Sequence, residues 1–207
     1  MYGNKAVIGI VGGIGSGKSR IAALFGELGC LIVDADAAVR ELYGSAAIRR
    51  RLRQWWGDEI LTPDGQVDRA AVGRKVFADP VQRRRLEGLL HPLVAAKQRA
   101  AMAAAVGKAR VKAFVWDIPL LVETGQDQQC DAVVFVDAPL KMRAQRVLAQ
   151  RGWSRRQLLQ REKLQLPLDK KRSIADHVVR NIADASYVRS QVREIFSRIL
   201  ADLPGRL

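Results

Sequence analysis

The sequence predicts an α/β fold in which helices cover both faces of a parallel sheet. Five short apolar runs alternate with longer segments of helical periodicity, the order expected of parallel strands joined by helices. The 207-residue chain is 48% hydrophobic and has no internal repeat or Pro/Ser-rich linker, so one sizeable core is expected.

The apolar runs are the expected strands: residues 6–11, 30–33, 111–116, 132–136 and 176–179. Apolar side chains recur every three or four positions in the expected helices: residues 18–28, 37–43, 46–55, 69–77, 81–90, 93–106, 140–149, 155–166 and 186–200. Pro92 is expected to end one helix and begin the next. The connection from residue 33 to residue 111 is too long for one crossover helix, which predicts a helical insertion where an acceptor would bind.

A glycine-rich segment from Gly12 to Ser19 joins the first strand to the first helix and fits the Walker A pattern G-x-x-x-x-G-K-[ST]. Glycine lets backbone N–H groups approach phosphate oxygens, lysine adds positive charge, and the helix directs its positive end at the anion. A plain tight turn is the alternative, but the strand before it and the helix after it favour nucleotide phosphates. The expected ATP-binding residues here are Gly13, Ile14, Gly15, Ser16, Gly17, Lys18 and Ser19.

Carboxylates follow the second and third strands, at the sheet edge where ligands of parallel sheets bind. Asp34 is the best candidate for a general base, although it or Asp36 could instead cap the next helix, a role that we assign to Asp36. Asp117 is typical of the acidic residue that holds Mg²⁺, together with the hydroxyl of Ser19. Because Asp34 has the same setting, either carboxylate could serve the metal. Glu123 is an acceptor contact or a surface residue.

Three arginines, Arg143, Arg146 and Arg151, follow the fourth strand on a polar helix. They could close over a nucleotide and neutralise charge in the transition state, while a mobile cover excludes water. An exposed basic helix is the alternative for at least one of them. His91 is either a substrate contact or a packed turn residue.

The formal net charge of +14 has several meanings. The basic clusters are dispersed and lack interleaved aromatic residues, which favours steering of small polyanions or a plain basic surface and makes nucleic acid an unlikely partner. No apolar run reaches the ~20 residues of a membrane span, so no membrane association is expected. Two cysteines, Cys30 and Cys130, predict reduced thiols in the cytoplasm and no zinc site.

The loop combines with further segments, namely Asp34-Ala35-Asp36, Asp68-Arg69, His91-Pro92, Ile118-Pro119-Leu120-Leu121 with Glu123, Arg146, Lys171-Arg172 and Asn181. In this combination the chain resembles the dephospho-coenzyme A kinases, a P-loop kinase family. The resemblance implies a three-layer fold with a five-stranded parallel sheet. It also implies one domain with a core (about 1–36, 109–150 and 174–207), a helical acceptor-binding insertion (about 37–108) and a lid (about 150–173).

The resemblance implies Mg²⁺-dependent transfer of the ATP γ-phosphoryl group to the ribose 3′-hydroxyl of dephospho-coenzyme A by a monomer or weak homo-oligomer. Asp34 would be the base, Lys18 and Ser19 would handle phosphate and metal, and Arg146 would be the lid arginine. The acceptor side would be built from Arg69, His91, Pro119, Leu120 and Leu121. A nucleoside or nucleotide kinase of the same fold is the nearest alternative, and a nucleic-acid-binding ATP-dependent protein is a more distant one.

Overall fold

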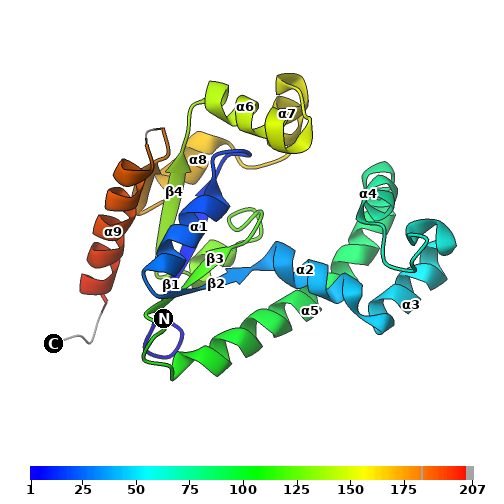
Figure 1. The fold of residues 1–207 in the computed structure, drawn as a ribbon, viewed down its shortest axis with the longest axis horizontal. Coiled ribbons are helices and arrows are strands. Elements are labelled where there is room, and N and C mark those ends of the chain that lie inside the picture. Colours follow the sequence, from blue (N-terminus) through cyan, green and yellow to red (C-terminus); the bar gives the residue numbers. More distant parts are fainter. Residues whose placement is uncertain (183, 204–207) are drawn as a thin grey trace. The chain divides into compact units, whose positions relative to one another are not determined.

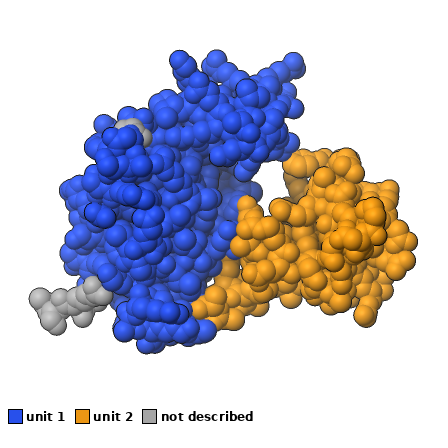
Figure 2. Space-filling model, in the orientation of Figure 1, with its two compact units in different colours: residues 1–34, 102–207 blue, residues 35–101 orange. Residues whose placement is uncertain are grey.

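A computed structural model describes residues 1–182 and 184–203. The chain forms two compact units, coloured separately in Figure 2. Unit 1 comprises residues 1–34 and 102–207, and unit 2 comprises residues 35–101.

Unit 1 is built on five parallel strands, β1 (Ala6–Gly12), β2 (Cys30–Asp34), β3 (Ala113–Asp117), β4 (Ala132–Asp137) and β5 (His177–Arg180). Their order in the sheet is β2-β3-β1-β4-β5, with β1 at the centre. The predicted α/β fold with a five-stranded parallel sheet is confirmed. The chain leaves β1 toward β3 and β2 on one side and returns to β4 on the other, so the strand order reverses at the carboxyl end of β1. Such a switch point is where open α/β sheets bind ligands.

The apolar alternation of β1 explains how the sheet is covered. Ile8 and Ile10 are fully buried on one face, where they belong to the same core as α1 (Lys18–Glu27) and α9 (Ala185–Ala201). Phe25 of α1 and Phe196 of α9 meet edge to face at a centroid distance of 5.9 Å. Val7 and Val11 are buried as well, on the opposite face, because successive strand side chains alternate between faces. Figure 1 shows α1 and α9 beside the sheet.

Unit 2 is helical and has a core of its own. Its elements are α2 (Ala35–Gly44), α3 (Ala46–Trp56), the 3₁₀ turn η1 (Asp58–Ile60), α4 (Arg69–Ala78) and the first part of α5 (Pro80–Val106). Leu52, Ile60 and Val72 are almost completely buried in this core. The helix α2 begins directly after β2, so Asp36 lies inside its first turn and the predicted capping role of Asp36 is wrong.

The predicted break at His91-Pro92 is also wrong, because α5 runs uninterrupted through Pro92. A proline inside a helix removes one backbone hydrogen bond and favours a kink. Leu86, Leu90 and Val94 recur every fourth residue across this position and are all buried in the core of unit 2. Packing of this continuous apolar stripe offsets the local cost of the proline.

The remaining helices of unit 1 follow β4. They are α6 (Leu140–Arg151), α7 (Arg155–Glu162) and α8 (Leu168–Ser173), with a 3₁₀ turn η2 (Gln126–Gln129) before β4. The helix predicted over residues 155–166 therefore ends four residues early, and α8 was not predicted. Cys30 and Cys130 are free thiols. Within the described residues, no helix combines the length and apolar character that crossing a membrane requires.

Candidate active site

The glycine-rich loop lies at the carboxyl end of β1, where the strand order reverses. Gly15 (φ 75°) and Gly17 (φ 94°) adopt left-handed backbone conformations that residues with a Cβ rarely take. Neither position has room for a side chain, since a Cβ on Gly17 would lie 2.3 Å from Nδ2 of Asn181. The loop is therefore tight, and it leads directly into α1, whose first residue is Lys18.

Lys18 folds back over the beginning of the loop. Its Nζ donates to the carbonyl oxygens of Gly12 and Gly13, both at 3.1 Å. Burial lowers the pKa of Lys18 from 10.5 to about 8, because desolvation disfavours the ammonium. The negative charge of Asp117 opposes this shift, whereas the positive charge of Lys171 adds to it. Lys18 is thus a cation that an incoming anion would stabilise.

Arg143 of α6 holds the first half of the loop. Arg143 is only 5% exposed, and its guanidinium donates to the carbonyl oxygens of Ala138 (3.1 Å) and Ile14 (3.3 Å). It also pairs with the carboxylate of Glu162, which itself accepts from the backbone N–H of Ile14 at 3.1 Å. Protein groups therefore accept from Nε and NH1 of Arg143. Since Arg143 is buried, it is not a residue of an exposed basic helix, which was the alternative interpretation.

Arg146 holds the second half of the loop from the next turn of α6. Its NH1 donates to Ser16 O (3.1 Å) and Gly15 O (3.4 Å), and its NH2 donates to Asn181 O (3.1 Å). The third predicted lid arginine, Arg151, lies with its guanidinium 5.0 Å from the ring centroid of Trp153. Its positive charge also lowers the pKa of Lys18, which places it near the loop.

Asp34 and Asp117 end two neighbouring strands and are register partners in the β2–β3 ladder. Both are half-buried, and adjacent strands lie about 4.8 Å apart. The negative charge of Asp117 raises the pKa of Lys18, so one carboxylate of this pair lies near the loop lysine. Ser19 is exposed in the first turn of α1.

The donor set of two carboxylates and a hydroxyl fits a hard cation such as Mg²⁺, which takes oxygen ligands. No group of three or more His, Cys, Asp or Glu side chains suited to a metal occurs in residues 1–182 and 184–203. Few protein ligands are typical of Mg²⁺ that is held partly by substrate phosphates.

The turn after β3 contains the predicted acceptor residues Pro119, Leu120 and Leu121. Pro119 and Leu120 are exposed, and Leu120 has φ 60°, the only left-handed conformation of a non-glycine residue in the described chain. Such strain persists only where the surrounding structure imposes it. Leu121, in contrast, is 2% exposed, and it fills the space that a Cβ on Gly9 would need. Its burial removes Leu121 from the exposed surface of the turn.

Glu123 is engaged by the protein itself. One oxygen accepts from Nζ of Lys171 at 2.7 Å and from the backbone N–H of Leu166 at 2.9 Å. Burial favours the neutral acid, but these hydrogen bonds outweigh it and lower the pKa of Glu123. Lys171 is only 4% exposed and also donates to Gln165 at 3.2 Å. The pair ties α8 to the turn after β3.

Three residues near the loop received no individual role in the sequence analysis: Glu162, Lys171 and Asn181. Lys171 and Asn181 lie in segments that carry the family resemblance, which was their only signal. Nothing in the spacing of residues marks Glu162, because its partners Ile14 and Arg143 are distant in sequence.

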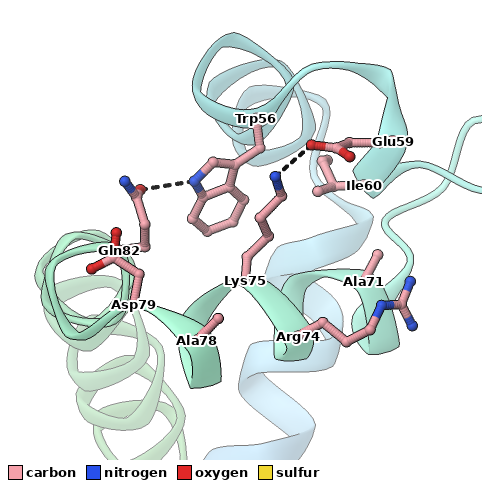
Figure 3. A pocket seen from close by; sticks show the side chains of 9 residues that line it. All are labelled: Trp56, Glu59, Ile60, Ala71, Arg74, Lys75, Ala78, Asp79 and Gln82. Atoms are coloured by element: carbon pink, nitrogen blue, oxygen red, sulfur yellow. Dashed lines mark hydrogen bonds and ion pairs between the residues drawn. The ribbon is translucent and has the colours of Figure 1, made fainter.

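The other predicted acceptor residues, Arg69 and His91, belong to unit 2 and are exposed. Arg69 begins α4 directly after Asp68, whose carboxylate caps the helix by accepting from two backbone N–H groups. A cavity of about 390 Å³ in unit 2 is lined by residues of α4 and its neighbours (Figure 3). Trp56 and Lys75 line this cavity, and neither Arg69 nor His91 does.

A Walker A loop at the switch point of a five-stranded parallel sheet, with carboxylates on the adjacent strand ends, defines a P-loop nucleotide-binding enzyme of the kinase type. The comparisons with known proteins narrow this class. The sequence model of the dephospho-CoA kinase family matches residues 6–186. The chain therefore belongs to the dephospho-CoA kinase family.

Individual relatives agree over nearly the full length. A dephospho-CoA kinase of Anaeromyxobacter dehalogenans is 40% identical over 201 residues, which cover 96% of this chain and 92% of the relative. One of Thermobifida fusca is 36% identical, with coverage of 96% and 98%. A crystal structure of a Thermus thermophilus protein matches with a TM-score of 0.78 at 32% identity and covers 98% of this chain and 100% of that one.

Proposed function

We propose that this protein transfers the γ-phosphoryl group of ATP to the ribose 3′-hydroxyl of dephospho-coenzyme A, giving coenzyme A and ADP, in the cytoplasm. One observation carries the proposal: in a chain of this family, a phosphate loop and a pair of neighbouring carboxylates share the carboxyl edge of one sheet. The two free thiols are in keeping with a reducing compartment.

The reaction needs little covalent chemistry from the protein, so positioning and electrostatics carry it. The loop N–H groups and Lys18 would hold the phosphates of ATP. Asp34 would accept the proton of the acceptor hydroxyl as its oxygen attacks the γ-phosphorus and the bond to the ADP oxygen breaks. Neutralisation of charge by Arg146 and Arg151 would favour the transition state over the ground state.

Ser19 and Asp117 would hold Mg²⁺ together with the ATP phosphates. When bound, the ion neutralises phosphate charge as it develops during transfer. Asp117 suits this role because its charge already acts on Lys18, and the assignment leaves Asp34 for the acceptor. Arg143 is assigned instead to bracing the loop, since it is buried, whereas Arg146 is only half-buried.

On the acceptor side, we propose contacts from Pro119, Leu120, Arg69 and His91, each of which is exposed. Unit 2 would serve as the acceptor-binding insertion and the segment from α7 to α8 as the lid. Leu121 is assigned to supporting the turn from the core, and Glu123 to holding Lys171.

The test is to incubate the protein with ATP, Mg²⁺ and dephospho-coenzyme A and to search by mass spectrometry for the acceptor with one added phosphate. AMP and other nucleosides serve as parallel acceptors. Phosphorylation of dephospho-coenzyme A alone is expected. Preferential phosphorylation of a nucleoside or nucleotide would replace this proposal with a nucleoside or nucleotide kinase. Nucleic-acid retention without any phosphorylated small molecule would refute both.

A further inference from the structure

Asn181 follows directly after β5 and is 1% exposed, although its side chain is polar. Its backbone N–H donates to Asp137 O at 2.8 Å, which continues the β4–β5 ladder by one residue. The backbone of Asn181 is thus fixed to the sheet. A buried amide that is rigidly held and directed at the catalytic loop calls for an explanation.

The side chain of Asn181 meets the loop at a single peptide. Its Nδ2 donates to Ser16 O at 2.7 Å, while Arg20 of α1 donates to its Oδ1 at 3.4 Å. These partners fix the orientation of the amide, because a carbonyl can only accept and a guanidinium can only donate. The amide nitrogen also fills the space beside Gly17 that a Cβ would take.

The carbonyl of Ser16 and the N–H of Gly17 belong to the same planar trans peptide and point in opposite directions. When Asn181 and Arg146 hold the carbonyl on one side of the loop, the N–H of Gly17 must face the other side. Among the described residues no backbone group accepts from this N–H. It is left available at the start of α1, where the helix dipole favours an anion.

We propose that Asn181 is a positioning residue that orients the Ser16–Gly17 peptide, so that the N–H of Gly17 points at the phosphates of the nucleotide. Without Asn181 the Ser16 carbonyl keeps only the longer bond from Arg146, so the peptide can rotate more easily and turn this carbonyl toward the phosphates, replacing a donor with a partial negative charge. Asn181 therefore acts on nucleotide affinity through the loop, without touching the transferred group.

The inference rests on the proposed function only in that ATP is the nucleotide bound. The test measures binding of Mg-ATP and of adenosine, which has no phosphate, by calorimetry without an acceptor. The variants are Asn181→Asp, which keeps the shape but loses the donor, and Asn181→Ser, whose hydroxyl is too short to reach Ser16. Ile182→Ala, at the exposed neighbouring residue, is the matched control.

For both Asn181 variants we expect at least a roughly 10-fold loss of ATP affinity, as for loss of a buried hydrogen bond that orders a binding group. Adenosine affinity and the KM for dephospho-coenzyme A are expected within about 2-fold of the unaltered protein, as is every value for Ile182→Ala. Unchanged ATP affinity, or equal losses for ATP and adenosine, would overturn the inference. Circular dichroism showing both variants unfolded would also overturn it, by assigning Asn181 to stability.

The two proposals fail in different ways. A protein that binds ATP through an Asn181-dependent loop but leaves dephospho-coenzyme A unmodified would refute only the proposed function. A protein that makes coenzyme A with either Asn181 variant at its full ATP affinity would refute only the role of Asn181.

Discussion

The lowered pKa of Lys18 should couple ATP binding to the uptake of a proton, which can be measured. Burial brings this pKa to about 8, so the free protein loses the Lys18 charge near pH 8 instead of near 10.5. A bound triphosphate stabilises the ammonium and raises the pKa again. Between these two values ATP binding must therefore take up a proton, and the affinity for ATP must fall as the pH rises.

The size of the effect follows from the single pKa. In the free protein about a tenth of Lys18 is neutral at pH 7, about half at pH 8 and about nine-tenths at pH 9. ATP binding should then take up about 0.1, 0.5 and 0.9 protons at these pH values. Above pH 8 the ATP affinity should fall by nearly 10-fold per pH unit until the pKa of the bound state is reached. At pH 8 and 9 a terminal phosphate with a last pKa of about 6 is almost completely ionised, so the proton uptake there reports on Lys18.

Isothermal titration calorimetry at pH 7, 8 and 9, each in two buffers of different ionisation enthalpy, measures the proton uptake directly. Lys18→Ala is the control, since it should bind ATP more weakly but with no rise in proton uptake. An uptake below about 0.2 protons at pH 9 in the unaltered protein, or the same rise in Lys18→Ala, would refute the assignment of the shifted pKa to Lys18.

Four substitutions test other parts of the structure. Lys18→Ala should abolish turnover with an unchanged circular dichroism spectrum, and near-normal activity would remove Lys18 from the mechanism. Asp34→Asn should lower kcat by about 100-fold or more with little change in ATP affinity, whereas an unchanged kcat would exclude a general base there. Glu123→Gln should cost about 2–4 kcal/mol of stability in urea unfolding at pH 7, because it leaves Lys171 buried without its counter-charge. The pKa of Glu123 is lowered from 4.5, so this loss should shrink as the pH falls below 4.5 and through the lowered pKa of the folded protein, and a pH-independent loss would exclude the ion pair. Pro92→Ala should raise the melting temperature by restoring one helical hydrogen bond, and a lower value would mean that Pro92 stabilises α5.

Most of the sheet could be predicted from the sequence because its signals are local. A buried parallel strand needs only a short apolar run, and each of the five predicted runs overlaps a strand of the structure. The phosphate loop was equally accessible, since Gly15 and Gly17 adopt conformations that glycine alone adopts readily. These features depend on residues adjacent in the chain, which the sequence displays directly.

The errors arose where packing overrides a local signal. Pro92 is a correct local reason to end a helix, but Leu90 and Val94 on either side of it bury one continuous stripe. In α8 the local signal is missing, because six residues give too few turns for a helical period to be recognised. The helix is nevertheless packed against the protein, and Lys171 within it is buried. Neither result could be derived without knowing what the segment packs against.

The arginines of α6 show how much the spacing of residues in the sequence predicts about their contacts. Arg143 and Arg146 are three residues apart, so a helix presents them on one face, and both do meet the phosphate loop. A guanidinium donates equally well to a phosphate and to a peptide carbonyl, however, and the sequence does not distinguish these acceptors. Arg143 donates to Ile14 O and Arg146 donates to Ser16 O, which turns these two carbonyls away from the anion and leaves the N–H groups of the same peptides, those of Gly15 and Gly17, for it. An arginine that the sequence assigns to nucleotide binding can therefore act on that binding indirectly, by fixing the backbone that contacts the phosphates.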